Sequence, residues 1–442
     1  MIRKAIFMLL AAVLYSASLY AVHLLVDNAG ADVGTAARIV YKLKEDPSFI
    51  YTINQNGVKH GLAKDAPEEE HLRNDAYVCG PKFAVYSASA ALYSISSIVW
   101  QGADPLSALF FTNLACFFGC AALIYLILMR SCGFGSSGFA ILSPALFLSL
   151  PTLYFLVYYP TYLFMLTFFM LAAIYLVMRS CDNNEFSYAR LFVSGIALGL
   201  TIGAGSQAAV CIFAGVVFTG IYAFSKRFFF KSLIIQALGM LAVVALSELI
   251  FQANGASLLK WVWLHTHENV YDNHLKEPFP FIPFIYFRIL YDLQPLTLAV
   301  FIGALFASKL WWKNATTEGR SLVISLIITL AALSILPNTP LFRILFPFFI
   351  VLQLSIFIMA MNTKTKAVKY AIIALLLIET TVTLPPALFI RLGQTEHNSP
   401  ILVFEDERKI LRHFDYELPE TTRGAKEQAG KPASGKRTPQ VK

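Results

Sequence analysis

Two carboxylates follow the first apolar run of the sequence, where the chain leaves a membrane span. Asp27 comes directly after VHLLV, so it lies at the membrane surface, and Asp32 comes five residues later. A carboxylate against lipid is costly unless it is solvated or used, and beside a hydroxyl it can act as a general base. Asp32 also opens an amphipathic stretch, where an acidic residue is a common helix cap. One face of that stretch is predicted to carry Val33, Ala36, Ala37, Val40 and Tyr41.

Two cations stand beside apolar segments, at positions suited to a lipid phosphate. Lys82 ends the turn Gly80-Pro81-Lys82 just before the apolar run 83–100. At that headgroup depth its ammonium can meet a phosphate or simply extend into water. Arg343, in PLFRILFPFF, lies at the outer end of a late span. A guanidinium there suits bidentate phosphate binding, and a purely structural role is the alternative.

A second polar segment gathers histidines and acidic residues. The stretch HTHENVYDNH places five such side chains within ten residues, namely His265, His267, Glu268, Asp272 and His274. Imidazole and carboxylate are common zinc ligands, but this spacing fits no standard zinc pattern. No metal is therefore predicted. The segment is either an ordinary polar loop or a source of hydrogen bonds to a phosphate or a sugar.

The elements that must hold these residues are membrane spans. Of the 442 residues, 57% are hydrophobic and 14% charged, against roughly 25% charged in a soluble globular chain. Apolar runs of about 20 residues, the length that crosses a bilayer, recur along the sequence. The first lacks a small-residue cleavage site, so we interpret it as an uncleaved span. We predict an all-α polytopic membrane protein with about eleven transmembrane helices, at 5–26, 105–129, 137–156, 158–179, 190–205, 207–225, 232–252, 286–308, 321–337, 341–361 and 369–389.

The run 83–100 is ambiguous because it is apolar but rich in Ser and Tyr. If it does not cross, one side of the membrane receives almost all basic residues of the short loops, and the positive-inside rule favours that arrangement. We therefore predict an interfacial helix at 83–100, a cytoplasmic N-terminus, and an outer location for 27–104 and 253–285. The cytoplasmic set is Arg3, Lys4, Arg130, Arg179, Arg190, Lys226, Arg227, Lys231, Lys309, Lys313, Arg320, Lys364, Lys366 and Lys369.

The domain organisation follows from these assignments. The net charge of +8 is an orientation signal rather than a nucleic-acid patch, so no nucleic-acid partner is predicted. Of six cysteines only Cys79 lies in a long loop, which excludes a disulfide framework. The predicted segments are a first span (1–26), an outer loop with amphipathic and interfacial helices (27–104), a transmembrane core (105–252), a second outer loop (253–285), C-terminal spans (286–390) and a polar tail, partly disordered (391–442).

The order of these motifs resembles the GT-C membrane glycosyltransferases, which use polyprenyl- or dolichyl-phosphate sugars and include protein mannosyltransferases and the aminoarabinose transferase. The resemblance covers about residues 5–360. Asp27-Asn28 stands for the family's acidic pair, AARIVYKL for the helix after it, and CGPKFAVYSASAALY for the turn and interfacial helix. SGIALGLTIGAGSQAAV, ENVYDNHLKEPFPFIPFIYF and RILFPFF are similar to later segments. The chain departs from the family where YYPTYLFM carries Tyr162 in place of Asp and where IGAGSQ replaces a Thr-Lys pair.

The resemblance implies inverting transfer of a sugar from a polyprenyl phosphate to a glycan, lipid or protein acceptor at the periplasmic or lumenal face of a membrane, most simply the bacterial inner membrane. Asp27, with Asp32 in reserve, would be the base. The leaving phosphate needs cations and hydrogen-bond donors, and no cofactor is implied. The resemblance implies that Lys82, Arg343, His265 and His274 bind the phosphate and that His267 and Glu268 bind the substrate.

Two other functions fit the same sequence. One is a transporter or flippase of lipid-linked sugars, for which Gly203, Gly205, Ser206 and Gln207 would mark a helix break. The other is a catalytically inactive relative of the transferases that serves as an assembly subunit, because the family's acidic pair is here Asp27-Asn28 and its Pro-Pro is Gly-Pro.

Overall fold

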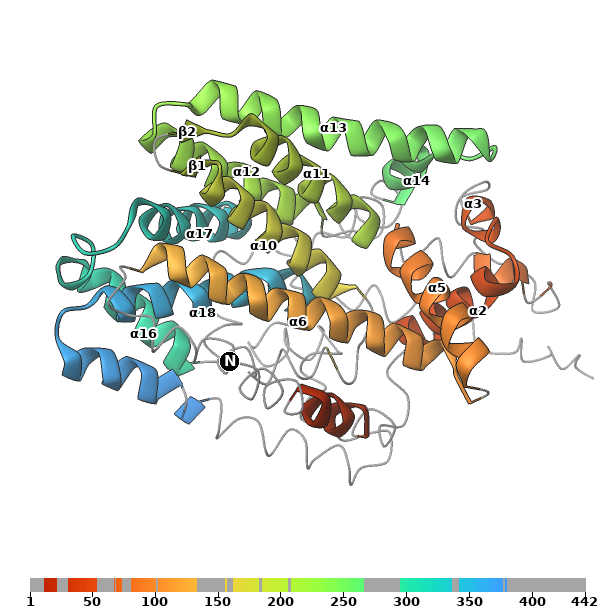
Figure 1. Cartoon of the computed structure of the whole chain (residues 1–442), viewed down its shortest axis with the longest axis horizontal. Helices are drawn as coiled ribbons and strands as arrows, with labels where there is room; N and C mark the ends of the chain where they lie inside the picture. Colours follow the sequence, from red (N-terminus) through yellow and green to blue (C-terminus); the bar gives the residue numbers. More distant parts are fainter. Residues whose placement is uncertain are drawn as a thin grey trace, which may run out of the picture. The chain divides into compact units, whose positions relative to one another are not determined.

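The computed structural model is built almost wholly of helices (Figure 1). It describes residues 12–21, 31–53, 67, 69–73, 81–100, 102–132, 156, 162–182, 185–205, 208–265, 295–335, 342–376 and 378–379, all within the compact unit Met1–Ser399. A two-residue antiparallel ladder joins the strands β1 (Cys181–Asp182) and β2 (Glu185–Phe186), which connect two helices. Within the described residues, the predicted all-α membrane fold is confirmed.

The described helices follow the predicted apolar runs closely, and the predicted span 137–156 lies almost wholly outside the described residues. The helix Ala12–Ala21 comes first. The later elements are α2 (Ala31–Glu45), α3 (Phe49–Thr52), α5 (Phe83–Val99), α6 (Pro105–Ser131), α10 (Leu163–Arg179), α11 (Tyr188–Ala204), α12 (Ala208–Ser225), α13 (Phe229–Ala253), α14 (Leu258–Leu264), α16 (Pro295–Phe306), the 3₁₀ turn η3 (Ser308–Leu310), α17 (Thr317–Ile335) and α18 (Phe342–Asn362).

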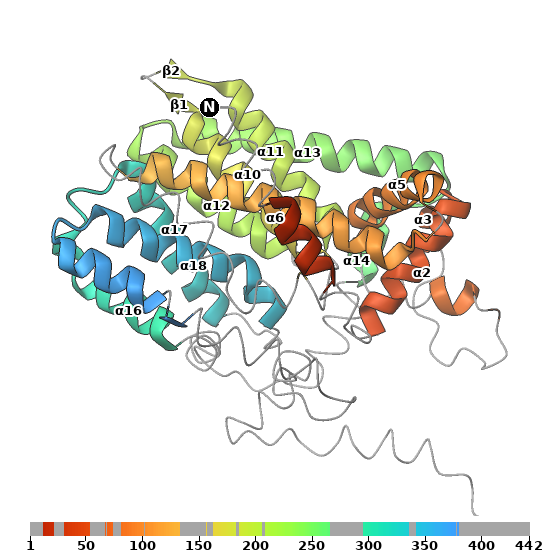
Figure 2. The same cartoon turned by 60° about the horizontal axis from the view of Figure 1, so that its bottom comes forward.

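Three of the described helices are long and apolar enough to cross a membrane, namely α6, α12 and α13. The start of α6 shows why a span begins where it does. Asp104 accepts a hydrogen bond from the Ser107 backbone N–H at 2.8 Å, and Pro105 occupies the first turn. Capping by Asp and a proline at the first helical position both favour a helix start. The chain is thus an integral membrane protein, and Figure 2 shows Ala12–Ala21 beside α6, where Tyr20 hydrogen-bonds to Ser107.

Glycines set the closest packing in the bundle, which is between α11 and α13 (Figure 1). A Cβ added at Gly195 would stand 2.0 Å from the Gln236 carbonyl oxygen, and one at Gly239 would stand 2.1 Å from the Phe192 carbonyl oxygen. Small residues four apart allow membrane helices to approach this closely. The Gly-Leu-rich stretch that begins at Gly195 therefore has a packing function.

The apolar surface of α13 is the part of the described chain best suited to face lipid. Large apolar side chains stand out along the helix and are more than half exposed at Ile234, Leu238, Leu241, Leu246 and Leu249. In water such a row would be unfavourable, whereas hydrocarbon solvates it without cost.

Loops with basic residues meet at one end of the bundle. The Arg130 guanidinium donates to the Met178 carbonyl at 3.0 Å, and the Thr316 hydroxyl donates to the Arg130 carbonyl at 3.1 Å. The Asn362 side chain donates to the Ser131 carbonyl at 3.3 Å. These bonds join the C-terminal ends of α6, α10 and α18 to the start of α17. We call this the basic end, and the opposite helix termini, near residues 105, 162, 205, 253 and 342, the site end.

The amphipathic helix α2 differs from expectation in its buried face. Val33, Ala36 and Val40 are buried as predicted, but Tyr41 is 47% exposed and Ala37 only half-buried. Ile39 and Leu43 are buried in their place. The prediction for Tyr41 was wrong because the stripe turns toward positions 39 and 43, where α5 and α6 cover it.

The helix α5 packs on α2 and on the first half of the bundle's α6. Its C-terminal turn carries exposed apolar side chains, with Ile98 and Val99 at 85% and 84% exposure and Trp100 at 52%. An apolar tip beside a tryptophan suits the lipid headgroup region. The interfacial position of 83–100 stays a prediction.

Candidate functional site

Lys82 is the most unusual charged residue at the site end. It directly precedes α5 and is only 3% exposed, and its ammonium lies 4.4 Å from the centre of the Tyr162 ring. Among the residues that the structure describes, none forms an ion pair or hydrogen bond with this ammonium. A buried cation without a counter-charge is costly, and a desolvated cation–π contact recovers only about 2 kcal/mol. No acceptor for its three N–H donors lies among the described residues, and an anion is the kind of ligand that would accept from them.

Two glycines fix the rings around Lys82. Gly205 ends α11, and a Cβ there would stand 2.6 Å from Cδ2 of Tyr162. Two residues earlier, a Cβ at Gly203 would stand 2.6 Å from Cζ of Phe83. Any larger residue would push these rings and with them Lys82. The glycines that could mark a transporter's helix break are therefore explained by packing against the site.

Arg343 belongs to the same end of the bundle through its position on α18. It is the second residue of that helix, three residues before Phe346. The Phe346 ring packs edge-on against Phe164, with centroids 5.1 Å apart, and Phe164 follows Tyr162 by two residues. The backbone of Arg343 thus lies about one helical turn from a residue that touches the Tyr162 segment; the side chain of Arg343 lies outside the described residues.

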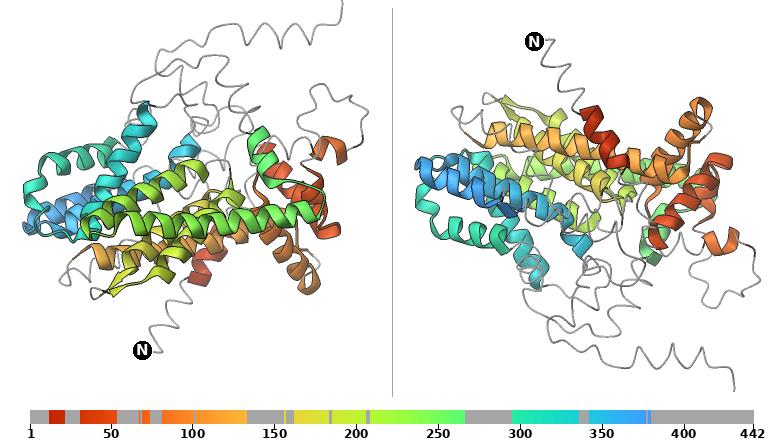
Figure 3. Two further views of the ribbon diagram at one scale, coloured as in Figure 1. Left: turned by 90° about the horizontal axis from the view of Figure 1, so that it is seen from above. Right: turned by 90° about the horizontal axis from the view of Figure 1, so that it is seen from below.

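His265 is linked to Lys82 by a row of aromatic rings. Phe83 lies 5.5 Å from Phe251, and Phe251 lies 6.5 Å from Trp261, centroid to centroid. The backbone N–H of His265 donates to the Trp261 carbonyl at the end of α14, and its side chain is 6% exposed. Figure 3 shows α14 at the same end of α13 as α3 and α5. Lys82, the end of α14 at His265 and the backbone of Arg343 thus each belong to the site end, and their shared role at a phosphate stays a prediction.

The remaining predicted site residues cannot be located. Asp27, His267, Glu268 and His274 lie outside the described residues. Asp32 is the second residue of α2, where the helix dipole favours a carboxylate, but its side chain is also outside the described set. Their roles stay predictions. Within the described ranges no group of three or more His, Cys, Asp or Glu side chains could hold a metal ion.

The sequence predicted no role for Tyr162 in the candidate site. The segments YYPTYLFM and IGAGSQ were noted only as departures from the family pattern, yet in the fold they meet at Tyr162 and Gly205, directly beside Lys82. In each segment the chain lacks an ionisable residue that the family has. Two such losses at distant segments are a sequence signal that the segments share one site.

The fold and this site define a helical membrane protein with a buried cation at one end of its bundle. No family model matches the chain, and no curated protein matches it. Among solved structures it is similar to the archaeal oligosaccharyltransferase AglB from Archaeoglobus fulgidus in complex with an inhibitory peptide and a dolichol-phosphate, with 12% sequence identity and a TM-score of 0.38. That match covers 90% of this chain and 61% of the other, so the chain spans less than two thirds of that protein. A likeness of this degree transfers neither residues nor activity.

Proposed function

We propose that the chain is an inverting glycosyltransferase of the GT-C type, which moves a sugar from a polyprenyl phosphate to an acceptor at the outer face of the membrane that holds the chain. One observation carries the proposal: Lys82, 3% exposed, holds an ammonium over the Tyr162 ring with no counter-charge among the described residues. A protein accepts such a cost where an anion binds. A lipid phosphate is the anion that a membrane surface offers.

The proposed reaction displaces a phosphate at the anomeric carbon. The acceptor hydroxyl oxygen forms the new bond to that carbon while its proton passes to Asp27, or to Asp32 in reserve. The bond between the anomeric carbon and the phosphate oxygen breaks with its electron pair, and negative charge grows on the leaving phosphate. That charge would be stabilised by Lys82 and Arg343, and further hydrogen bonds would come from His265 and His274. With these groups the proposed reaction needs no metal or cofactor.

The partners follow from the same chemistry. The donor is a polyprenyl-phosphate sugar held with its phosphate at Lys82, and His267 and Glu268 are the proposed contacts to substrate hydroxyls. The acceptor is a glycan, a lipid or a protein. We place the N-terminus in the cytoplasm and the site on the periplasmic face of a bacterial inner membrane, because the basic loops gather at the other end of the bundle.

The decisive experiment replaces the proposed base. Asp27→Asn keeps the size of the side chain and most of its hydrogen bonding but removes the proton acceptor, so turnover should fall about 10²–10⁴-fold while donor binding and folding persist. The assay is sugar transfer from purified lipid donor, run beside a donor-binding measurement. Asp46→Asn is the matched control, because Asp46 is an exposed carboxylate of the same loop that bonds only to Ser48 among the described residues.

The outcomes separate the possible functions. Loss of transfer in Asp27→Asn, with transfer intact in Asp46→Asn, supports the enzyme. Full transfer by both Asp27→Asn and Asp32→Asn contradicts the proposed base. Donor binding without any transfer by the unaltered protein contradicts the enzyme and leaves the flippase or the inactive assembly subunit.

A further inference from the structure

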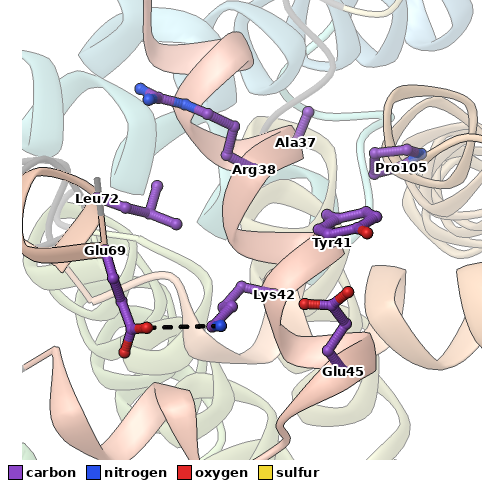
Figure 4. Close-up of a pocket in the computed structure, with 8 residues that line it drawn as sticks. All are labelled: Ala37, Arg38, Tyr41, Lys42, Glu45, Glu69, Leu72 and Pro105. Carbon is purple, nitrogen blue, oxygen red and sulfur yellow. Dashed lines mark ion pairs between the residues drawn. The ribbon is translucent and has the colours of Figure 1, made fainter. Parts of the chain in front are cut away.

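A cavity of about 500 Å³ lies along α2, beside Ala37, Tyr41 and Glu45 (Figure 4). Most of its lining comes from one stretch of α2, and the rest comes from the helical turn 69–73 and from the first residue of α6. The lining residues are Ala37, Arg38, Tyr41, Lys42, Glu45, Glu69, Leu72 and Pro105. The volume falls within the roughly 300–1,000 Å³ range of small-molecule sites.

Ion pairs and a hydrogen bond hold the polar lining in place. Lys42 pairs with Glu69 at 3.5 Å, and Glu69 pairs with Arg73 at 2.5 Å. The Tyr41 hydroxyl donates to the Glu45 carboxylate, which raises the pKa of Tyr41 above its ordinary value. Figure 4 shows Tyr41 and Glu45 next to each other and the Lys42–Glu69 pair across the cavity. The cavity is therefore preformed, with its donors and acceptors already oriented.

The balance of charges in the cavity points to a neutral ligand. The lining holds two basic side chains, Arg38 and Lys42, and two carboxylates, Glu45 and Glu69, so its formal charge is zero. An anion would meet two carboxylates and a cation would meet two basic groups, and each would be repelled by half of the lining. A polyhydroxylated molecule can donate to the carboxylates and accept from the cations at once.

The tyrosine narrows the chemical class further. The Tyr41 ring lies 6.4 Å from the Tyr93 ring of α5, centroid to centroid, yet Tyr41 is 47% exposed and lines the cavity, so part of its ring surface is open to a ligand. Leu72, Ala37 and Pro105 add apolar surface around it. An aromatic face flanked by carboxylates and basic groups suits a sugar ring, which has both apolar C–H faces and hydroxyl edges.

We propose that this cavity binds a neutral saccharide, as a subsite for the acceptor or for sugar units beyond the one transferred. The assignment of acceptor rests on the proposed glycosyltransferase function, but saccharide binding itself does not. The cavity contains neither Lys82 nor any other residue placed at the phosphate. It would hold glycan on the loop side of the membrane surface while the donor phosphate is bound at the site end.

Binding can be measured without turnover. The full chain is reconstituted in lipid nanodiscs, so that no maltoside detergent competes, and neutral disaccharides (maltose, chitobiose and mannobiose) are titrated with detection by saturation-transfer NMR. At least one should bind, and Tyr41→Ala should weaken it about tenfold through loss of one aromatic contact. Glu45→Gln should weaken it less. Tyr188→Ala is the matched control, because Tyr188 is 50% exposed but lies outside the cavity.

The results decide between ligands and between the two proposals. Binding that fails in Tyr41→Ala and survives in Tyr188→Ala supports the saccharide site. Binding of none of the disaccharides, equal binding by Tyr41→Ala, or binding of inorganic phosphate or phosphoethanolamine in place of sugar overturns it. Saccharide binding at Tyr41 in a chain that transfers no sugar would overturn the enzyme and leave the cavity standing.

Discussion

Lys82 and Lys226 each place an ammonium over a tyrosine ring, at opposite ends of the bundle, but in different surroundings. Lys82 is 3% exposed and lies 4.4 Å from the Tyr162 ring centre, whereas Lys226 is only half-buried and lies 5.9 Å from the Tyr222 ring centre. A half-buried ammonium keeps much of its water, so the basic end bears little desolvation cost. At the site end burial of the Lys82 ammonium carries a desolvation cost, and a bound anion would offset that cost.

The neighbouring polar groups differ in the same sense. At the basic end Arg130 and Arg190 donate to the carbonyls of Met178 and Arg179, where α10 ends. Basic side chains there satisfy carbonyls left open at helix ends and complement the helix dipole. Among the described residues Lys82 has no such acceptor. The comparison teaches that Arg130 and Arg190 cap helix ends, whereas Lys82, the one lysine that is buried among the described residues, is the functional candidate.

The largest effect should come from Lys82→Met. Methionine has similar length and packs well on aromatic rings, so the variant should fold with unchanged or higher thermal stability, because a buried charge with no partner among the described residues is removed. Donor binding and transfer should fall about 10²–10³-fold, as for loss of one charge-stabilising donor. Lys226→Met is the matched control and should keep both. Transfer is measured with lipid donor, and equal effects of the two substitutions would end the distinction between the two ends.

The helices themselves could be predicted from the sequence because membrane spans impose length and apolarity. The run 105–129 became α6 (Pro105–Ser131), and the run 207–225 became α12 (Ala208–Ser225). The basic residues of the short loops also predicted one basic end of the bundle. Spans alternate in direction, so every second loop lies at the same end. The bounds of these helices along the chain could therefore be predicted from the sequence alone.

Only part of the candidate site could be predicted from the sequence, because its contacts join segments that are far apart along the chain. Lys82 was predicted from a cation at headgroup depth, but its contact with Tyr162 depends on how α5 and α10 pack. The cavity on α2 depends on where the turn 69–73 lies, and the pairing of Glu69 with Lys42 across these segments could not be predicted from the sequence. Helical periodicity predicted that α2 has a buried apolar stripe but wrongly included Tyr41 in it. The exact direction of the stripe depends on the helices that pack against α2.

A smaller effect is expected at the ring beneath Lys82. Tyr162→Leu removes the π face and should weaken donor binding about tenfold, whereas Tyr162→Phe keeps the face and should bind nearly as well as the unaltered protein. Donor binding is measured by titration in nanodiscs, and the pH dependence of binding is recorded for each variant. A merely structural ring would tolerate Leu and Phe alike in binding, so equal affinities for the two variants would exclude the positioning role.

The smallest effect should be at Tyr222, and it should appear in stability alone. Its hydroxyl donates to Glu318 at 3.3 Å and to the Met178 carbonyl at 3.4 Å, which ties α12 to α17 and α10 at the basic end. Tyr222→Phe should lower the free energy of unfolding by about 1 kcal/mol, the net value of a typical hydrogen bond, with transfer unchanged. Tyr162→Phe is the control, since the Tyr162 hydroxyl makes no hydrogen bond within the described residues and its loss should cost less. Unfolding titrations in mixed micelles compare the two variants. If Tyr222→Phe were as stable as the unaltered protein but slower in transfer, the basic end would have a part in the chemistry, and the division between an orienting end and a reacting end would fail.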